Sequence, residues 1–281
     1  MKVLRANTAG FCMGVGLALK RLDRALQEQR KPIATLGPII HNPQVLAEYA
    51  KKGVRRIARA EEATRGACVI IRAHGIPRTE EARLVERGAQ LVDATCPRVK
   101  AAQLAIARAT RQEQCLLLFG EADHPEVRGL LSYACAERYV FGSLDECKTL
   151  PLAPAGRYVL AAQTTQDIRQ FVAIQAYLEQ RLAGGLPSLQ TICDATEKRQ
   201  SEALEIAARV DCMVVVGGRD SGNTRRLAEL AAGTGIPALH VENEKGLDAA
   251  FFRGKLFAGL TAGASTPKSL IDAVEFFLES L

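Results

Sequence analysis

Three cysteines occupy positions at which a short apolar run gives way to a helix-like stretch: Cys12, Cys96 and Cys193. Glycine or proline stands beside the first two, and such residues mark turns that present a side chain to a ligand. The cysteines are 84 and 97 residues apart, so three separate segments each supply one thiol. Three thiolates can hold a zinc ion or an iron–sulfur cluster. Zinc sites usually use paired Cys-x-x-Cys knuckles, which this sequence lacks. A 4Fe–4S cluster usually takes four cysteines, and three would leave one iron open to act as a Lewis acid.

The alternative is that these cysteines are buried apolar thiols, which is the more common state of a free cysteine. That interpretation fits the five others, which lie at or near apolar runs: Cys68, Cys115, Cys135, Cys147 and Cys212. The flanking turns and the regular spacing separate the first three from this group.

Polar residues recur at similar distances beyond each of the three cysteines. The second set is His41, His124 and Ser221, which follow the cysteines by 29, 28 and 28 residues. The third set is His74, Thr164 with Thr165, and Ser265, a further 33, 40 and 44 residues along. We interpret this pattern as a threefold internal repeat of roughly 85–95 residues. If the three repeats meet head to head, the thiols converge inside a ring of polar side chains.

The histidines indicate an anion site. Only four occur in the chain, and three of them fall in these sets, whereas His240 lies outside and is interpreted as structural. Histidine, serine and asparagine side chains at helix N-termini together suit a phosphate or diphosphate. No Gly-x-x-x-x-Gly-Lys-Ser/Thr loop is present, so a nucleoside triphosphate is not indicated.

Glu126 follows His124 by two residues and falls in the first turn of a predicted helix. A carboxylate there often serves only to complement the helix dipole. Beside an open iron and a diphosphate, the same carboxyl group could deliver protons. Spacing alone leaves both interpretations open.

The elements that carry these residues alternate between short apolar strands and helices. Strands are predicted at residues 2–6, 33–36, 69–72, 91–93, 115–119, 158–162, 213–216 and 255–260, and helices at 15–26, 43–52, 78–87, 99–111, 125–133, 167–182, 197–208, 223–232 and 268–281. This alternation predicts an α/β fold with parallel sheets, whose ligands collect at the carboxyl ends of the strands. All of the repeated residues are predicted to lie at such ends.

Composition is ordinary for a globular protein, with 48% hydrophobic and 24% charged residues. The net charge of +6 suits an anionic small molecule or an acidic protein partner, while the scattered basic residues argue against nucleic acid. No apolar stretch approaches the ~20 residues of a membrane span, and no leader sequence precedes the first strand. We therefore expect a cytoplasmic bacterial protein without nucleic acid or membrane partners, as a monomer or weak dimer.

These motifs resemble those of the 4-hydroxy-3-methylbut-2-enyl diphosphate reductase family, iron–sulfur enzymes of the methylerythritol phosphate route of isoprene biosynthesis. The matching segments are Ala6-Asn-Thr-Ala-Gly-Phe-Cys12-Met-Gly-Val, His41-Asn, Ala73-His74-Gly, Asp93-Ala-Thr-Cys96-Pro, His124-Pro-Glu126-Val, Gln163-Thr164-Thr165, Cys193-Asp-Ala-Thr, Ser221-Gly-Asn223-Thr and Thr261-Ala-Gly-Ala-Ser265. They run in order from end to end of the chain, so the resemblance is specific.

The resemblance implies an α/β fold of three pseudo-threefold-related lobes, at residues 1–97, 98–193 and 194–281, around a central 4Fe–4S cluster on Cys12, Cys96 and Cys193. It implies that the apical iron takes the substrate hydroxyl, with Glu126, His124 and Thr164 as catalytic residues. The implied substrate-binding residues are His41, His74, His124, Thr164, Thr165, Ser221, Gly222, Asn223 and Ser265. The implied reaction uses two electrons and two protons to convert the allylic alcohol to isopentenyl and dimethylallyl diphosphate. Reduced ferredoxin or flavodoxin is the implied electron donor.

Two departures from the family pattern are visible. Gly222 stands where many members have a second serine, so that a side-chain contact is lost while the backbone N–H is kept. Thr8 and Ala9 replace the common Pro-Arg, and we expect little effect. Two alternative functions are a three-cysteine iron–sulfur enzyme similar to quinolinate synthase, against which the motif order argues, and a non-catalytic iron–sulfur sensor. A sensor would need neither the polar ring nor Glu126.

Overall fold

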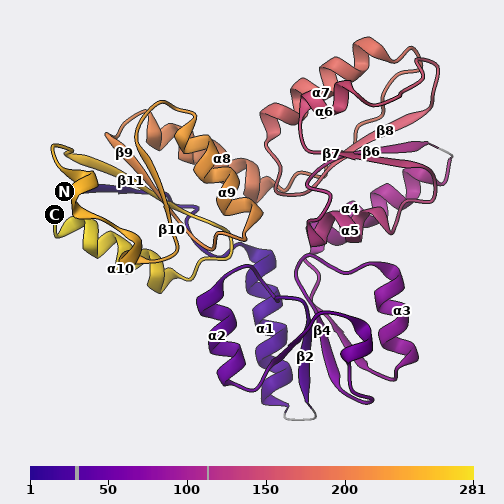
Figure 1. Cartoon of the computed structure of the whole chain (residues 1–281), viewed down its shortest axis with the longest axis horizontal. Helices are drawn as coiled ribbons and strands as arrows, with labels where there is room; N and C mark the ends of the chain where they lie inside the picture. Colours follow the sequence, from indigo (N-terminus) through magenta and orange to yellow (C-terminus); the bar gives the residue numbers. More distant parts are fainter. Residues whose placement is uncertain (29–31, 113) are drawn as a thin grey trace. The chain divides into compact units, whose positions relative to one another are not determined.

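The computed structural model describes residues 1–28, 32–112 and 114–281. Three short parallel sheets with flanking helices make up the chain (Figure 1), which confirms the predicted α/β class. The residue contacts define two compact units. Unit 1 comprises Met1–Gly16, Ile40–Tyr49 and Asp194–Leu281, and unit 2 comprises Leu17–Ile39 and Ala50–Cys193.

Unit 1 contains a four-stranded sheet in the order β1-β11-β9-β10. The strands are β1 (Lys2–Arg5), β9 (Cys212–Val216), β10 (Ala238–Val241) and β11 (Phe257–Ala262), and the helices α8 (Asp194–Ala207), α9 (Gly222–Ala232) and α10 (Lys268–Glu279), with 3₁₀ turns at Glu244–Gly246 and Ala249–Phe252. Side chains of β9 alternate between the faces: Val214 packs with Ile271 of α10, and Val215 packs with Ile206 of α8. Both faces are therefore buried, as expected of a parallel sheet.

Unit 2 contains two sheets, in the orders β3-β2-β4-β5 and β7-β6-β8. The strands are β2 (Ile33–Leu36), β3 (Arg55–Ile57), β4 (Cys68–Ile71), β5 (Gln90–Asp93), β6 (Cys115–Phe119), β7 (Arg138–Phe141) and β8 (Tyr158–Ala162). The helices are α3 (Arg78–Glu86), α4 (Pro97–Thr110), α5 (Pro125–Leu131), α6 (Leu144–Lys148) and α7 (Ile168–Arg181), with a 3₁₀ turn at Ala60–Glu62. Helices α1 (Met13–Gln27) and α2 (Pro43–Lys51) each begin in unit 1 and continue into unit 2.

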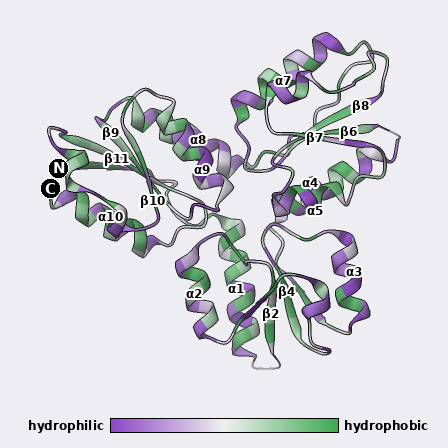
Figure 2. Ribbon diagram, in the orientation of Figure 1, coloured by the Kyte–Doolittle hydropathy of each residue, from purple (hydrophilic) through white to green (hydrophobic). Residues whose placement is uncertain are grey.

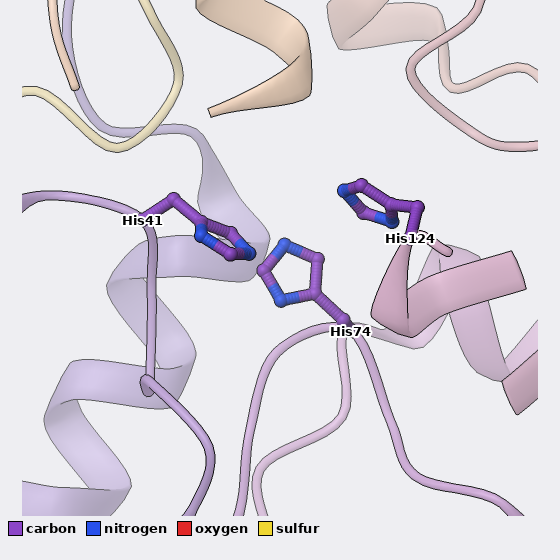
Figure 3. A group of neighbouring side chains, drawn as sticks. All are labelled: His41, His74 and His124. Atoms are coloured by element: carbon purple, nitrogen blue, oxygen red, sulfur yellow. The ribbon is translucent and has the colours of Figure 1, made fainter. Parts of the chain in front are cut away.

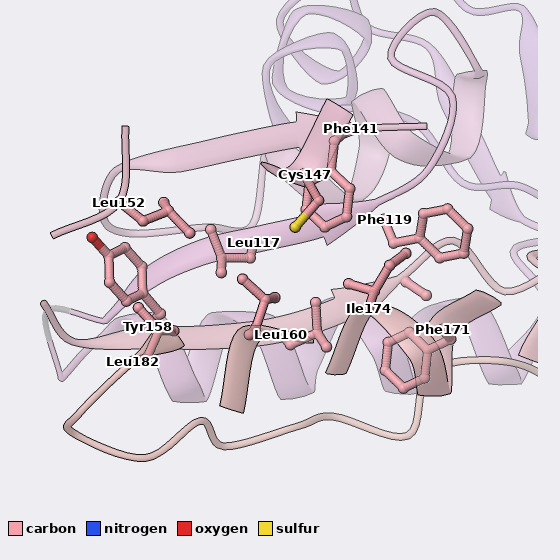
Figure 4. Packing of buried hydrophobic residues seen from close by; sticks show 12 residues of the cluster. Leu117, Phe119, Phe141, Cys147, Leu152, Tyr158, Leu160, Phe171, Ile174 and Leu182 are labelled. Atoms are coloured by element: carbon pink, nitrogen blue, oxygen red, sulfur yellow. The ribbon is translucent and has the colours of Figure 1, made fainter. Parts of the chain in front are cut away.

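The apolar strands supply the cores. Leu117 and Phe119 of β6 pack against Ile174 of α7 (Figure 4), while Leu116 and Leu118 face Ile106 of α4 on the other side of the sheet. Figure 2 shows the strands and inner helix faces as the hydrophobic parts of the ribbon. Rigid strands in the middle of each sheet thus carry the loops that follow their carboxyl ends.

The three sheets have the same strand order when the strands of each sheet are read from the edge whose segment leads to a cysteine. That order is β1-β11-β9-β10 for Cys12 and β5-β4-β2-β3 for Cys96. For Cys193 it is β8-β6-β7, with Ser188 bridging Leu160 of β8 in place of a fourth strand. The segment before Cys12 therefore lies in the sheet of residues 212–262, although it was predicted to belong to lobe 1. The division of lobes after residues 97 and 193 stays a prediction.

The sequence pattern missed three strands, β3, β7 and β10. Each lies at an edge of its sheet, and together they bury few residues, so they lack the continuous apolar run that marks a central strand. Cys193 was predicted to follow the end of a strand. In the structure it follows an isolated bridge instead. Pro187 has no N–H to offer there, and the Thr191 hydroxyl instead bonds both the N–H and the carbonyl of Ala162. No helix in the described ranges is long and apolar enough to cross a membrane.

Candidate active site

Each of the three predicted cysteine ligands stands directly before a helix, α1, α4 or α8. Each also donates its backbone N–H to a loop that follows the neighbouring strand, at or beside a residue of the third repeated set. The bonds are Cys12 to Ala264 (3.1 Å), Cys96 to Ala73 (2.9 Å) and Cys193 to Thr164 (3.0 Å). The repeat in the sequence therefore corresponds to one hydrogen bond made three times, which fixes where each thiol-bearing turn lies.

The three thiols are half-buried, and none of the three forms a disulfide among the described residues. At Cys12 the N–H of Val15 donates to the sulfur at 3.5 Å, and helix N-termini favour negative charge such as that of a thiolate. This donor set suits an iron–sulfur cluster, because thiolates are its usual ligands. Cys12 belongs to unit 1, and Cys96 and Cys193 belong to unit 2.

The remaining cysteines differ in burial. Cys147 and Cys212 are fully buried, and desolvation raises the pKa of both thiols, to about 11 for Cys147. Cys68 and Cys115 are only half-buried. Cys135 is exposed, so the prediction that it is a buried thiol was wrong. It lies in the turn between α5 and β7.

In unit 2, His74 and His124 lie side by side (Figure 3). Their ring centroids are 5.5 Å apart and the ring planes meet at 82°. His124 caps α5, and its Nδ1 accepts the N–H of Glu126 at 3.1 Å. A neutral ring that accepts at Nδ1 carries its proton on Nε2, and Nε2 is then a donor.

Glu126 is almost wholly buried, at 1% exposure, and Thr164 is its hydrogen-bond partner. The Thr164 N–H donates to one carboxyl oxygen at 2.6 Å, and its hydroxyl donates to the other at 3.0 Å. Desolvation raises the pKa of Glu126 to about 7, and the two bonds from Thr164 partly offset that rise. Near neutral pH this carboxyl can therefore hold or release a proton, whereas a residue kept only for the helix dipole would be exposed and ionised.

In unit 1, four predicted residues lie at the ends of β9 and β11 and at the start of α2. The Ser265 hydroxyl donates to the carbonyl of His41 at 2.9 Å. The Ser221 hydroxyl caps α9 by accepting the N–H of Thr224 at 3.3 Å. Asn223 is buried, and its Nδ2 has no hydrogen-bond partner among the described residues. An unsatisfied buried donor in the first turn of a helix suits an anionic ligand.

Two further predicted residues have local roles. Gly222 is buried at the first position of α9, where its N–H is one of the free amides of the helix end. The Thr165 hydroxyl accepts a bond from Gln163 Nε2 at 3.2 Å. His240, outside the repeated sets, bonds the carbonyl of Gly217 through Nε2 at 2.9 Å, in agreement with a structural role.

Sequence reasoning missed several buried polar residues around these loops. Asn42 follows His41 and has a buried Nδ2 without a partner in the described part of the chain. Arg199 and Glu202 of α8 bond the loop before Cys12. The replacement of the family's proline by Thr8 was expected to have little effect. In the structure the Thr8 N–H donates to Glu202, and a proline would lack this N–H. Amphipathic periodicity could have revealed Arg199, because this arginine falls on the buried face of α8, where apolar residues are expected.

Comparisons with known proteins place the chain. A family model described as LytB protein matches residues 3–279. The chain belongs to this family. A Nitratidesulfovibrio vulgaris protein named 4-hydroxy-3-methylbut-2-enyl diphosphate reductase is 61% identical over the full length of both chains. A Pelobacter propionicus protein of the same name is 42% identical and covers 98% of this chain and 96% of its own.

Two solved structures agree. An (E)-4-hydroxy-3-methyl-but-2-enyl diphosphate reductase, the terminal enzyme of the non-mevalonate pathway, is 36% identical with full coverage of both chains and a TM-score of 0.69. The Plasmodium falciparum E-1-hydroxy-2-methyl-but-2-enyl-4-diphosphate reductase has a TM-score of 0.93 at 24% identity, covering 100% of this chain and 87% of its own, and shows the same fold. The full-length family match decides against the resemblance to quinolinate synthase.

Proposed function

We propose that the chain is an oxidoreductase that removes the hydroxyl group of 4-hydroxy-3-methylbut-2-enyl diphosphate. Two electrons and two protons enter, the carbon–oxygen bond breaks, and water leaves with isopentenyl or dimethylallyl diphosphate. Full-length relatives named for this activity support the proposal. The observation that carries it on this chain is the buried Glu126–Thr164 pair, a proton source placed beside His124.

Cys12, Cys96 and Cys193 are the residues that would hold one 4Fe–4S cluster. Their half-buried thiols at helix starts fit this donor set. When bound, a cluster with three cysteine ligands supplies the electrons and one iron open to an oxygen ligand. Reduced ferredoxin or flavodoxin is the proposed electron donor, and the chain is proposed to act as a cytoplasmic monomer or weak dimer.

The diphosphate would be bound by side-chain and backbone donors. His41, His74 and His124 offer ring nitrogens, and Ser221, Gly222, Asn223 and Ser265 offer hydroxyl, amide and backbone N–H groups. The unsatisfied Nδ2 of Asn223 supports this role, because a phosphate oxygen would satisfy it. Helix N-termini add the positive end of their dipoles. Thr165 would contribute beside Thr164 on the same loop.

Glu126 would supply the proton that leaves with the hydroxyl group. With a pKa of about 7, an appreciable fraction of the carboxyl is protonated at neutral pH. Glu126 can pass the proton to the substrate oxygen, and the Thr164 hydroxyl, which lies 3.0 Å from one carboxyl oxygen, holds the carboxyl group in position to do so. The burial of both side chains keeps bulk water from competing for the proton.

The function is tested by purifying the full chain anaerobically and assaying it with the allylic diphosphate and a low-potential reductant, with product detection by NMR. We expect both isopentenyl and dimethylallyl diphosphate, and iron in the wild-type protein. Cys96→Ala should lose iron and activity, whereas Cys68→Ala, at another half-buried thiol, should keep both. Wild-type iron content in Cys96→Ala, or no turnover by iron-replete wild-type protein, would contradict the proposal.

A further inference from the structure

The loop that leads into Cys12 is held by a buried arginine. Arg199 on α8 is 3% exposed. One guanidinium nitrogen donates to the carbonyl of Thr8 and, at 3.0 Å, to that of Ala262 at the end of β11. The other donates to the carbonyl of Gly10 at 3.1 Å. A single side chain thus ties two carbonyls of the loop to the end of a central strand.

The same loop is held through its N–H groups by an acidic residue. Glu202, three residues after Arg199 and on the same side of α8, accepts the N–H of Asn7 at 2.7 Å and that of Thr8 at 2.8 Å. It also accepts the Thr8 hydroxyl at 2.5 Å. Arg199 therefore binds the acceptors of the loop and Glu202 binds its donors.

The loop has little regular structure of its own to hold it. Residues 6–12 lie between β1 and α1, and Gly10 has a φ of 112°, which other residues rarely adopt. Two residues after Gly10, the Cys12 N–H bonds the carbonyl of Ala264, in the loop that follows Ala262. Since Arg199 joins Ala262 to Gly10, it spans the two segments that define the position of the Cys12 backbone. Breaking these bonds would remove hydrogen bonds from a buried charged group, which is costly, so the arrangement resists movement.

We propose that Arg199 and Glu202 are positioning residues that hold the loop of residues 7–11, here called the Cys12 loop, so that the Cys12 thiol is preset to bind iron. The inference rests on the proposed function, in that Cys12 is taken as a cluster ligand. Groups that orient a metal ligand without touching the metal typically change affinity about 10- to 100-fold when they are lost.

The first variant is Arg199→Lys, which keeps the charge but cannot span three carbonyls. Iron release to a ferrous chelator is measured on the anaerobically purified full chain. Alkylation of Cys12 by iodoacetamide is then measured by mass spectrometry on the same chain after chelation, with Cys96 as the internal reference. We expect iron release about 10- to 100-fold faster and faster alkylation of Cys12 relative to Cys96. Arg209→Lys, at an exposed arginine just beyond α8, is the matched control and should match the wild type.

The second variant is Glu202→Gln, which places an amide N–H₂ against the donors of the Cys12 loop. Because the site is only half-buried, this variant should fold even if Arg199→Lys does not. Iron release should rise roughly threefold to tenfold, the loss expected for one hydrogen bond of typical strength. Thr8→Val removes the hydroxyl donor, and in the double variant the two effects should add to less than their sum, since both variants change the bond between the Thr8 hydroxyl and Glu202. Glu205→Gln, at an exposed position of the same helix, is the control.

The outcomes separate the two levels of the proposal. Unchanged Cys12 alkylation in folded Arg199→Lys and Glu202→Gln proteins would refute the positioning role. Faster alkylation with unchanged iron release would refute its link to the cofactor. Wild-type protein that binds no iron would overturn the proposed function, while the alkylation measurement would still decide whether these residues position Cys12.

Discussion

Two carboxylates in this chain receive the same pair of donors and yet differ in acidity. Glu126 in unit 2 is bonded by the N–H and the hydroxyl of Thr164, and Glu202 in unit 1 by the N–H and the hydroxyl of Thr8. Desolvation raises the pKa of Glu126 to about 7. At Glu202 desolvation also raises the pKa, but the bonds from Thr8 and Asn7 outweigh this effect and hold the pKa below its ordinary value. The deeper burial of Glu126 and the additional bond from Asn7 at Glu202 therefore decide which threonine–glutamate pair can exchange protons and which is a fixed anion that holds a loop.

The largest effect is expected from Glu126→Gln. Glutamine keeps the shape of the side chain but cannot donate a proton as a carboxyl does, so turnover should fall on the order of 10²-fold or more, with normal iron content. Steady-state kinetics with saturating reductant measures this. Glu86→Gln, at an exposed glutamate of α3, is the control. Turnover near the wild-type rate would make Glu126 as structural as Glu202 and remove the contrast.

The pH dependence of stability gives the second test. Because the folded pKa of Glu126 lies above its ordinary value of 4.5, its contribution to stability is complete below about pH 4.5 and is lost as the pH rises through 7. The shift corresponds to about 3 kcal/mol as an order of magnitude. The difference in urea unfolding free energy between wild type and Glu126→Gln should change across that window in favour of the variant. A constant difference from pH 4 to 8 would show that the carboxyl is not desolvated.

Thr164→Val should have a smaller effect on the same pair. It removes the hydroxyl donor and keeps the N–H, so the pKa of Glu126 should rise further, since the lost bond lowered it. Turnover should fall about tenfold, the cost of one hydrogen bond to a charged group. The alkaline limb of the pH–rate profile should shift to higher pH. Thr79→Val, at an exposed threonine of α3, provides the comparison. A shift of that limb to lower pH would contradict the assignment of the Thr164 hydroxyl as a donor to Glu126.

The smallest effect on stability is expected from Glu202→Gln. A lowered pKa contributes stability above the ordinary value of 4.5 and loses it as the pH falls, opposite in sign to Glu126. Since the residue is only half-buried, the unfolding free energy near pH 7 should fall by less than about 1 kcal/mol, and the difference should vanish in acid. Urea titrations at pH 7 and pH 3.5 measure it. A decrease that persists in acid would show that packing, rather than charge, underlies the role of Glu202.

Much of the candidate site could be predicted because its signals are local. The apolar runs at β6 and β8 predicted both strands within their observed bounds, since a central parallel strand is buried on both faces. Turn residues beside Cys12 and Cys96 marked the starts of α1 and α4. Residue types and spacing thus predicted the candidate ligands, the polar residues and the fold class, and the structure confirms the fold class.

The tertiary structure decided what depends on which distant segments meet. Pairing of β1 with β11 joins Lys2 to Phe257, and no local pattern specifies that register. Arg199 reaches the carbonyl of Thr8 across 191 residues of sequence. The acidity of Glu126 was left open by spacing, because desolvation is set by the packing around a group rather than by its neighbours in the chain. Sequence by itself determined which chemical groups stand at the loop positions, and burial in the folded chain determined which of them can move a proton and which serve as fixed charges.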